Sequence, residues 1–196
     1  LIGGAVAGAG NVIANQTGAT AVGVWVTGGT TGVSILGNSI YNSFNLGIEL
    51  DPTGVNANDA GDADAGNNNG QNFPVLATAA TSGANTTITG SLNSNANTTY
   101  RIEFFANPIG TQDATNGEGR RYLGSTTVTT NGSGNATINA TLAGVRVAAG
   151  DRITATATVD LGSGNYGDTS EFAANIAATS YIVAVTTTAD VTDGTT

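Results

Sequence analysis

The segment GNVIANQTGATAVGVWVTGGTTGVSILGNSIYNSFNLGIEL, residues 10–50, decides the fold. It contains two near-repeats: GNVIAN at 10–15 returns as GNSIYN at 37–42, and VGVWV at 22–26 returns as LGIEL at 46–50. Short apolar runs separated by Gly, Asn and Thr turns, recurring at offsets of 27 and 24 residues, are typical of stacked coils. Residues 1–50 are therefore expected to form coils of a short parallel β-helix, in which each coil needs a neighbour to bury its inner face.

Residues 73–178 have a different sequence pattern. Polar and apolar residues alternate through 86–92, 100–105 and 151–159, which is the period of half-buried strands. Further strands are expected at 122–130, 134–142 and 169–176, and Asn131-Gly132 between two of them is expected to close a hairpin. Short strands at this spacing predict an immunoglobulin-like β-sandwich. The predicted fold class is therefore all-β: a short parallel β-helix segment followed by an Ig-like sandwich.

Residues 51–72 form an Asp/Asn/Gly-rich loop between these regions, long enough to suggest a function. Clustered carboxylate and amide oxygens are ligands that Ca²⁺ prefers, and the nearby glycines permit tight turns. A structural Ca²⁺ site joining the two regions is expected here; the alternative is a solvated polar linker. The candidate ligands are Asp51, Asn56, Asp59, Asp62, Asp64 and Asn67.

The region 179–196 is expected to contain one more strand and a polar tail. Tyr181, Val183 and Val185 alternate with polar residues, so this strand is a candidate donor to the open coil edge of a neighbouring copy. Trp25 lies between two valines, so it is expected to face outward if they face the core. Trp25, Tyr181, Val183 and Val185 are the predicted interface residues.

Composition excludes several functions. The net charge of −9 and the absence of Lys argue against nucleic acid or an acidic membrane as partner, and no apolar run is long enough to span a bilayer. Without Cys or His, the chain has no thiol nucleophile, no His base and no zinc site of the usual type. Glu49 and Asp51 are a conceivable carboxylate pair, but two coils are too few for a substrate groove, so no enzyme is expected. The other acidic residues are expected in turns and surface ion pairs: Asp113, Glu118, Asp160, Asp168 and Glu171.

The order of these segments adds a resemblance. GNVIANQTG…LGIEL resembles the last coils of bacterial cell-surface right-handed parallel β-helix proteins, and NDAGDADAGNNNGQNFPVL is similar to the segment that follows them. The region from TTYRIEFFANP to GDTSEFAANI resembles the sandwich that comes next, and VTTTADVTDGTT resembles the opening of CSLREA-type modules in large secreted adhesin-like proteins. The resemblance implies an extracellular repeat or filament module that contacts copies of itself or adjacent repeats. An adhesin module that binds surface glycans or a host protein is the alternative.

Overall fold

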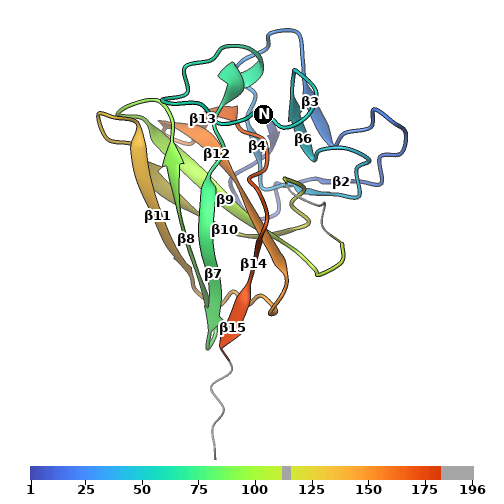
Figure 1. Ribbon diagram of the computed structural model, residues 1–196, viewed down its shortest axis with the longest axis vertical. Helices are drawn as coiled ribbons and strands as arrows, with labels where there is room; N and C mark the ends of the chain where they lie inside the picture. The colour runs from blue at the N-terminus through green and yellow to red at the C-terminus, as the bar shows by residue number, and fades with distance from the viewer. Residues whose placement is uncertain (112–115, 182–196) are drawn as a thin grey trace, which may run out of the picture.

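The computed structural model describes residues 1–111 and 116–181, and this part of the chain is all-β. Two sheets face each other in its C-terminal region, the first antiparallel and the second antiparallel except for one parallel pair at its edge (Figure 1). The first has the order β10-β9-β12-β13, with β14 also paired to β12. Its strands are β9 (Thr99–Asn107), β10 (Arg121–Thr129), β12 (Arg152–Gly162), β13 (Asn165–Thr169) and β14 (Ile176–Ala177).

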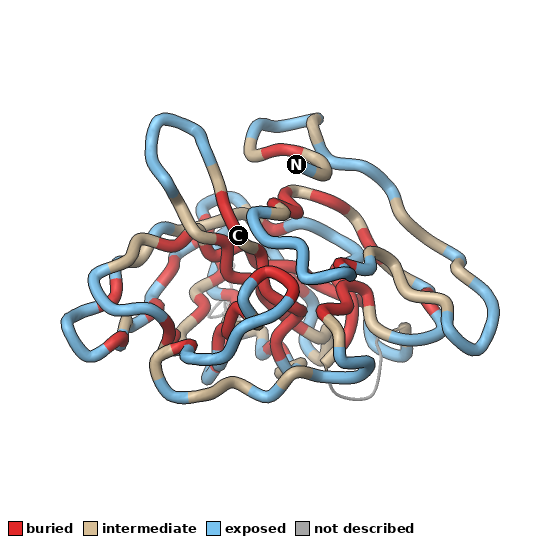
Figure 2. Tube along the Cα trace, turned by 90° about the horizontal axis from the view of Figure 1, so that it is seen from above, coloured by how far each residue is buried: buried red, intermediate tan, exposed pale blue. Residues whose placement is uncertain are grey.

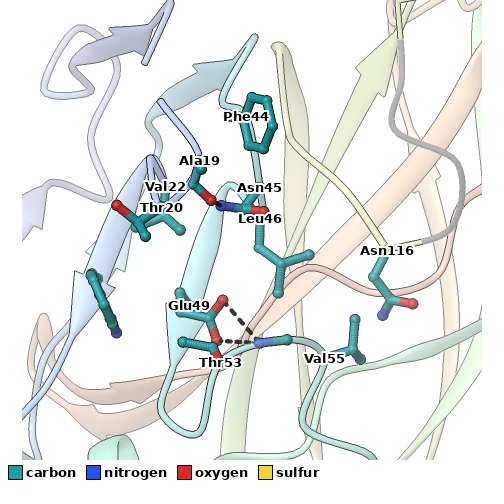
Figure 3. A pocket seen from close by; sticks show the side chains of 12 residues that line it. Ala19, Thr20, Val22, Phe44, Asn45, Leu46, Glu49, Thr53, Val55 and Asn116 are labelled. Carbon is teal, nitrogen blue, oxygen red and sulfur yellow. Dashed lines mark hydrogen bonds between the residues drawn. The ribbon is translucent and has the colours of Figure 1, made fainter. Parts of the chain in front are cut away.

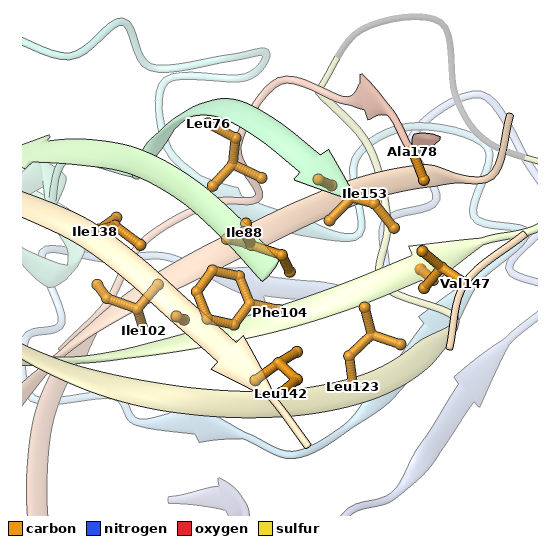
Figure 4. Packing of buried hydrophobic residues seen from close by; sticks show 14 of the residues in the cluster. Leu76, Ile88, Ile102, Phe104, Leu123, Ile138, Leu142, Val147, Ile153 and Ala178 are labelled. Atoms are coloured by element: carbon orange, nitrogen blue, oxygen red, sulfur yellow. The ribbon is translucent and has the colours of Figure 1, made fainter. Parts of the chain in front are cut away.

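The second sheet has the order β11-β8-β7-β15. Its strands are β7 (Val75–Ser82), β8 (Asn85–Asn93), β11 (Asn135–Leu142) and β15 (Thr179–Tyr181). Alternate side chains of both sheets point inward and form one core around Phe104, Ile88 and Ile153 (Figure 4). This core accounts for the alternation in the sequence, because one face of each sheet is buried against the other.

Two details of the expected sandwich are wrong. Asn131-Gly132 does not close a hairpin, because β10 pairs with β9 and β11 pairs with β8, so the turn links opposite sheets. The strand expected at 169–176 is interrupted between β13 and β14. There, the Ser170 N–H donates to the Ala157 carbonyl, and the Ala173 N–H donates to the Ala155 carbonyl. The two donors are three residues apart, whereas the two acceptors on β12 are only two residues apart. The extra residue makes a β-bulge, which redirects the side chains beside it.

Residues 1–50 form three parallel strand pairs rather than larger sheets. We call β1 (Ile2–Gly3), β2 (Val12–Ala14) and β3 (Val24–Val26) the first tier, and β4 (Ile35–Leu36), β5 (Ser39–Tyr41) and β6 (Ile48–Leu50) the second tier. β2 pairs with β5, and β3 with β6, at the offsets of the two sequence repeats. Each sheet has only two strands, so the expected parallel β-helix is not shown, although the repeats are confirmed as parallel partners.

The repeated asparagines explain the matching turns of the two tiers. Asn15 and Asn42 both adopt left-handed backbone, with φ of 63° and 57°, a conformation that Asn tolerates better than most residues. Their side chains are also bonded, because Asn42 Nδ2 donates to Asn15 Oδ1 over 3.1 Å. A second asparagine pair joins the tiers at Asn11 and Asn38. The Oδ1 of Asn38 accepts from both the backbone N–H and the Nδ2 of Asn11. The tiers are thus aligned by polar side chains at their corners as well as by strand pairing.

A second apolar core lies between the tiers and the sandwich. It contains five side chains from the tiers, Val26, Ile35, Ile40, Ile48 and Leu50, together with Phe105 and Phe172 from the sandwich. Viewed from above, buried chain fills the middle of the molecule and exposed loops form its rim (Figure 2). The tiers and the sandwich therefore share buried surface.

Candidate functional site

The sandwich covers the free edge of the second tier with carboxylates. Glu118 accepts from the backbone N–H of Asn42 over 2.7 Å and from that of Ser43 over 2.6 Å. Glu103 accepts from the Gly37 N–H over 2.7 Å and from Arg101 Nε over 2.8 Å. Such charge-assisted bonds to backbone donors are the stronger class of hydrogen bond. The backbone donors lie in the turns after β4 and β5, so these carboxylates hold the corners of the second tier against the sandwich.

The third side of the second tier is covered in the same way. Glu171 accepts from the N–H of Leu50 through Oε1 and from that of Asn56 through Oε2, each over 3.0 Å. On β4, the Ile35 N–H donates to Thr169 Oγ1 over 2.9 Å. On β5, the Ile40 N–H donates to the Gly119 carbonyl over 2.9 Å, so every strand of the second tier meets an acceptor from the sandwich.

The bulge between β13 and β14 positions this contact. Glu171 and Phe172 lie at the interruption, and both are 2% exposed. Phe172 meets Phe105 edge-on, with ring centroids 5.3 Å apart and an interplanar angle of 89°. A Cβ on Gly47 or Gly119 would lie 2.8 or 2.7 Å from the Phe172 ring, so two glycines make room for it. Phe105 and Phe172 therefore bury the side of the second-tier core that faces the sandwich.

Burial changes the titration of these carboxyls. It raises the pKa of Glu171 to about 7, with the bonds from Leu50 and Asn56 opposing the rise and the charge of Glu49 adding to it. Burial also raises the pKa of Glu103, against the effect of its bonds to Gly37 and Arg101. The pKa of Glu49 is raised by burial and by nearby Asp51, against the bond from Gly54. The contact region between the tiers and the sandwich, called the junction below, therefore contains carboxyl groups whose ionisation costs free energy.

The roles of Glu118 and Glu171 correct the expectation of surface ion pairs. Glu118 is 1% exposed and Glu171 is 2% exposed, and both accept backbone N–H groups of the tiers. Asp168 accepts from the Gly32 N–H of the tiers and from Asn69 Nδ2 of the loop at 51–72. Asp113 lies outside the described residues, and Asp160, near the end of β12 rather than in a turn, accepts from the Gly162 N–H. No local pattern distinguishes Glu118 and Glu171 from exposed acids, because their partners in the tiers are 75 or more residues away.

The first tier is less covered than the second. Three register pairs place Ile2 over Ile35, Ile13 over Ile40 and Val24 over Ile48. The second-tier members are 3%, 1% and 1% exposed, whereas their first-tier partners are only partly buried. Within the described residues, β1, β2 and β3 each pair with one strand, so their outer edges have no strand beside them. The two tiers therefore differ. The sandwich covers the second tier, whereas the outer edges of the first-tier strands have no strand beside them among the described residues.

Of the six predicted metal ligands, the structure brings three together. One oxygen from each of Asp59, Asp62 and Asp64 lies within 4.8 Å of the others. Asp62 is also held by the Asn72 N–H, the Ser94 hydroxyl and Asn95 Nδ2. Burial raises the pKa of Asp62, and the charges of Asp64 and Asp59 add to the rise. A divalent cation would relieve this repulsion.

The other three predicted ligands have separate partners. Asp51 Oδ1 accepts from the indole N–H of Trp25 over 2.8 Å. Asn56 Nδ2 donates to the Leu50 carbonyl, and Asn67 Oδ1 accepts from Gly29 and Thr30. Asn68, in the short helix η1 (Asn67–Gly70), is fully buried and donates to the carbonyls of Val33 and Thr169. The loop thus fastens the tiers to the sandwich through amides.

The predicted interface residues have different outcomes. Trp25 is 44% exposed between partly buried Val24 and buried Val26, which confirms the outward orientation. Tyr181 ends β15, which pairs in parallel with β7 of the same chain. Val183 and Val185 lie outside the described residues.

Comparisons with known proteins leave the family open. A scan against protein-family models found no match, and neither did a search of curated proteins. Among the described residues, no helix has the length and apolarity needed to cross a membrane.

Proposed function

We propose that this chain is a structural module of an extracellular bacterial surface or filament protein, which assembles head-to-tail with neighbouring copies. The observation that carries the proposal is the difference between the two tiers. The second tier is sealed by the sandwich, whereas the first tier presents unpaired strand edges over partly buried Ile2, Ile13 and Val24. Another strand layer would bury these side chains and pair these edges.

The same asymmetry supports a linear array. β15 lies at the end of the sandwich remote from the tiers (Figure 1). A contact between unlike ends of identical copies is heterologous, so it repeats without closing unless a rotation forms a ring. We further propose that the tiers are the last coils of a parallel β-helix and that the sandwich is immunoglobulin-like. The resemblance to large secreted repeat proteins supports both assignments and the extracellular location.

Substituting Val12 with lysine is expected to weaken self-association about tenfold or more, because a charged side chain beside the open edge of β2 would oppose strand pairing there. Val12 is 71% exposed, and the pairing of Asn11 and Asn15 with Ser39 and Tyr41 leaves its amide on the open edge. The measurement is sedimentation equilibrium across a concentration series, with negative-stain microscopy of the assemblies.

Val75→Lys is the matched control, since Val75 is 57% exposed on β7 of the sandwich and should leave association unchanged. A monomeric parent chain at high concentration would contradict the proposed assembly. Equal association of the Val12→Lys and Val75→Lys variants would place the contact elsewhere.

We also propose that Ca²⁺ binds the carboxylates of Asp59, Asp62 and Asp64 and stiffens the loop between tiers and sandwich. At about 10 mM Ca²⁺ the free energy of unfolding should rise by about 1 to 3 kcal/mol, given the weak affinities of extracellular calcium modules. Asp64→Asn should abolish most of this gain while leaving the Ca²⁺-free protein equally or more stable. The reason is that the charge of Asp64 opposes ionisation of Asp62.

Thermal unfolding in calcium and in chelator measures the gain. Asp160→Asn removes one carboxylate near the end of β12 and should keep the calcium effect. The same calcium-induced shift in Asp64→Asn and the parent chain would rule out this site.

A further inference from the structure

A hollow of about 620 Å³ opens on the side of the tiers, between β3, the β5–β6 turn and the loop after β6. Figure 3 shows Glu49 inside it, with Phe44 and Leu46 along one flank. Its volume is in the range of small-ligand sites. It lies beside the strands rather than on their free edges, so it is separate from the proposed joint between copies.

Two aromatic side chains at this hollow are exposed without an evident structural need. Trp25 is 44% exposed and Phe44 is 64% exposed. The indole is held in place, because its N–H donates to Asp51 Oδ1 over 2.8 Å. A fixed aromatic surface in water is typical of a binding site, since stacking a ligand on it buries apolar area at little entropic cost.

Glu49 supplies unused hydrogen-bond acceptors. The residue is 2% exposed, yet within the described part of the chain its two carboxylate oxygens share a single donor, the Gly54 N–H, at 3.0 and 3.2 Å. A carboxylate can accept about four hydrogen bonds. A buried carboxyl with spare acceptor positions at the wall of a hollow favours a ligand that brings hydroxyl donors.

We infer that this hollow binds neutral hexopyranose units of an oligosaccharide, with ring faces on Trp25 and Phe44 and hydroxyls donating to Glu49. Such sugars combine apolar C–H faces with hydroxyl donors, which matches the two kinds of surface present. Acidic sugars fit poorly, because no cationic side chain among the described residues lines the hollow. An organic ammonium could also meet an aromatic and a carboxylate, but it would fill little of this volume.

Trp25 is the single tryptophan of the chain, so its fluorescence reports directly on the site. The probes are cellotetraose, maltotetraose and mannotetraose, titrated to about 10 mM, a range that covers millimolar affinities. We expect a saturable change in Trp25 emission with at least one of them. Phe44→Ala should weaken binding about tenfold, the effect of losing one stacking contact, and Glu49→Gln should weaken it less.

Leu161→Ala is the matched control, since Leu161 is 66% exposed but does not line the hollow. A flat response to all three sugars would overturn the inference, as would binding that Phe44→Ala leaves unchanged. Saturable quenching by tetramethylammonium without any sugar response would show that the site takes cations instead.

Discussion

Replacing Phe172 with alanine is expected to lower the free energy of unfolding by about 3 to 5 kcal/mol, the cost of deleting a buried aromatic ring. The ring is 2% exposed and packs edge-on against Phe105. It also lies against Gly47 of the tiers and Gly119 before β10, where a Cβ would be too close. Neither glycine has a side chain to refill the space, so the cavity should persist and the cost should fall at the upper end of this range.

Chemical denaturation followed by circular dichroism measures this loss. Phe44→Ala removes the same ring from a residue that is 64% exposed, so it should change stability by no more than about 0.5 kcal/mol. A cost for Phe172→Ala below about 1 kcal/mol would mean that the stability of the tiers does not depend on the packing of Phe172 against Phe105.

The strand pairing of the tiers could be predicted because the sequence repeats itself. Residues that recur at a fixed offset have equivalent places in successive turns of chain, so GNVIAN and GNSIYN pair as β2 and β5. The sandwich strands could be predicted because their core-facing residues are apolar and the alternate residues are mostly polar, which leaves a period of two in the sequence even in β9 and β12, where both faces are buried. Both patterns are local, and each can be found without knowing the rest of the fold.

The junction could not be predicted, because its contacts join residues that are distant in sequence. Glu118 and Glu171 resemble surface acids until β10, β13 and the tiers are assembled around them. The bulge that directs Glu171 and Phe172 toward the tiers arises from a one-residue mismatch with β12, which depends on pairing rather than on composition. In the acidic loop, composition predicted the cluster of Asp59, Asp62 and Asp64, but not that neighbouring amides serve as hydrogen-bonding groups of the junction.

Raising the pH from about 5 to about 8 is expected to destabilise the protein by about 2 kcal/mol through Glu171. Its pKa in the folded chain is about 7, against an ordinary value of 4.5. Between these values the folded state binds more protons than the unfolded state, so the free energy of unfolding falls as the pH rises. Below about pH 4.5 both states are protonated, and well above pH 7 both are ionised, so the change is confined to this window. Glu103 and Glu49 have raised pKa values and act in the same direction.

Denaturant unfolding at several pH values, in chelator to exclude calcium, measures this slope. Glu171→Gln should flatten it by about 2 kcal/mol across the window, because the titrating group is gone. The variant should be less stable than the parent chain at pH 5, since its amide NH₂ replaces one of the oxygens that accept from Leu50 and Asn56. Asp160→Asn, away from the junction, controls for the change in net charge. Two results would contradict the prediction: stability that rises from pH 5 to 8 in the parent chain, or an equal slope in Glu171→Gln. Either would mean that the contact between Glu171 and β6 does not depend on protonation of the Glu171 carboxyl.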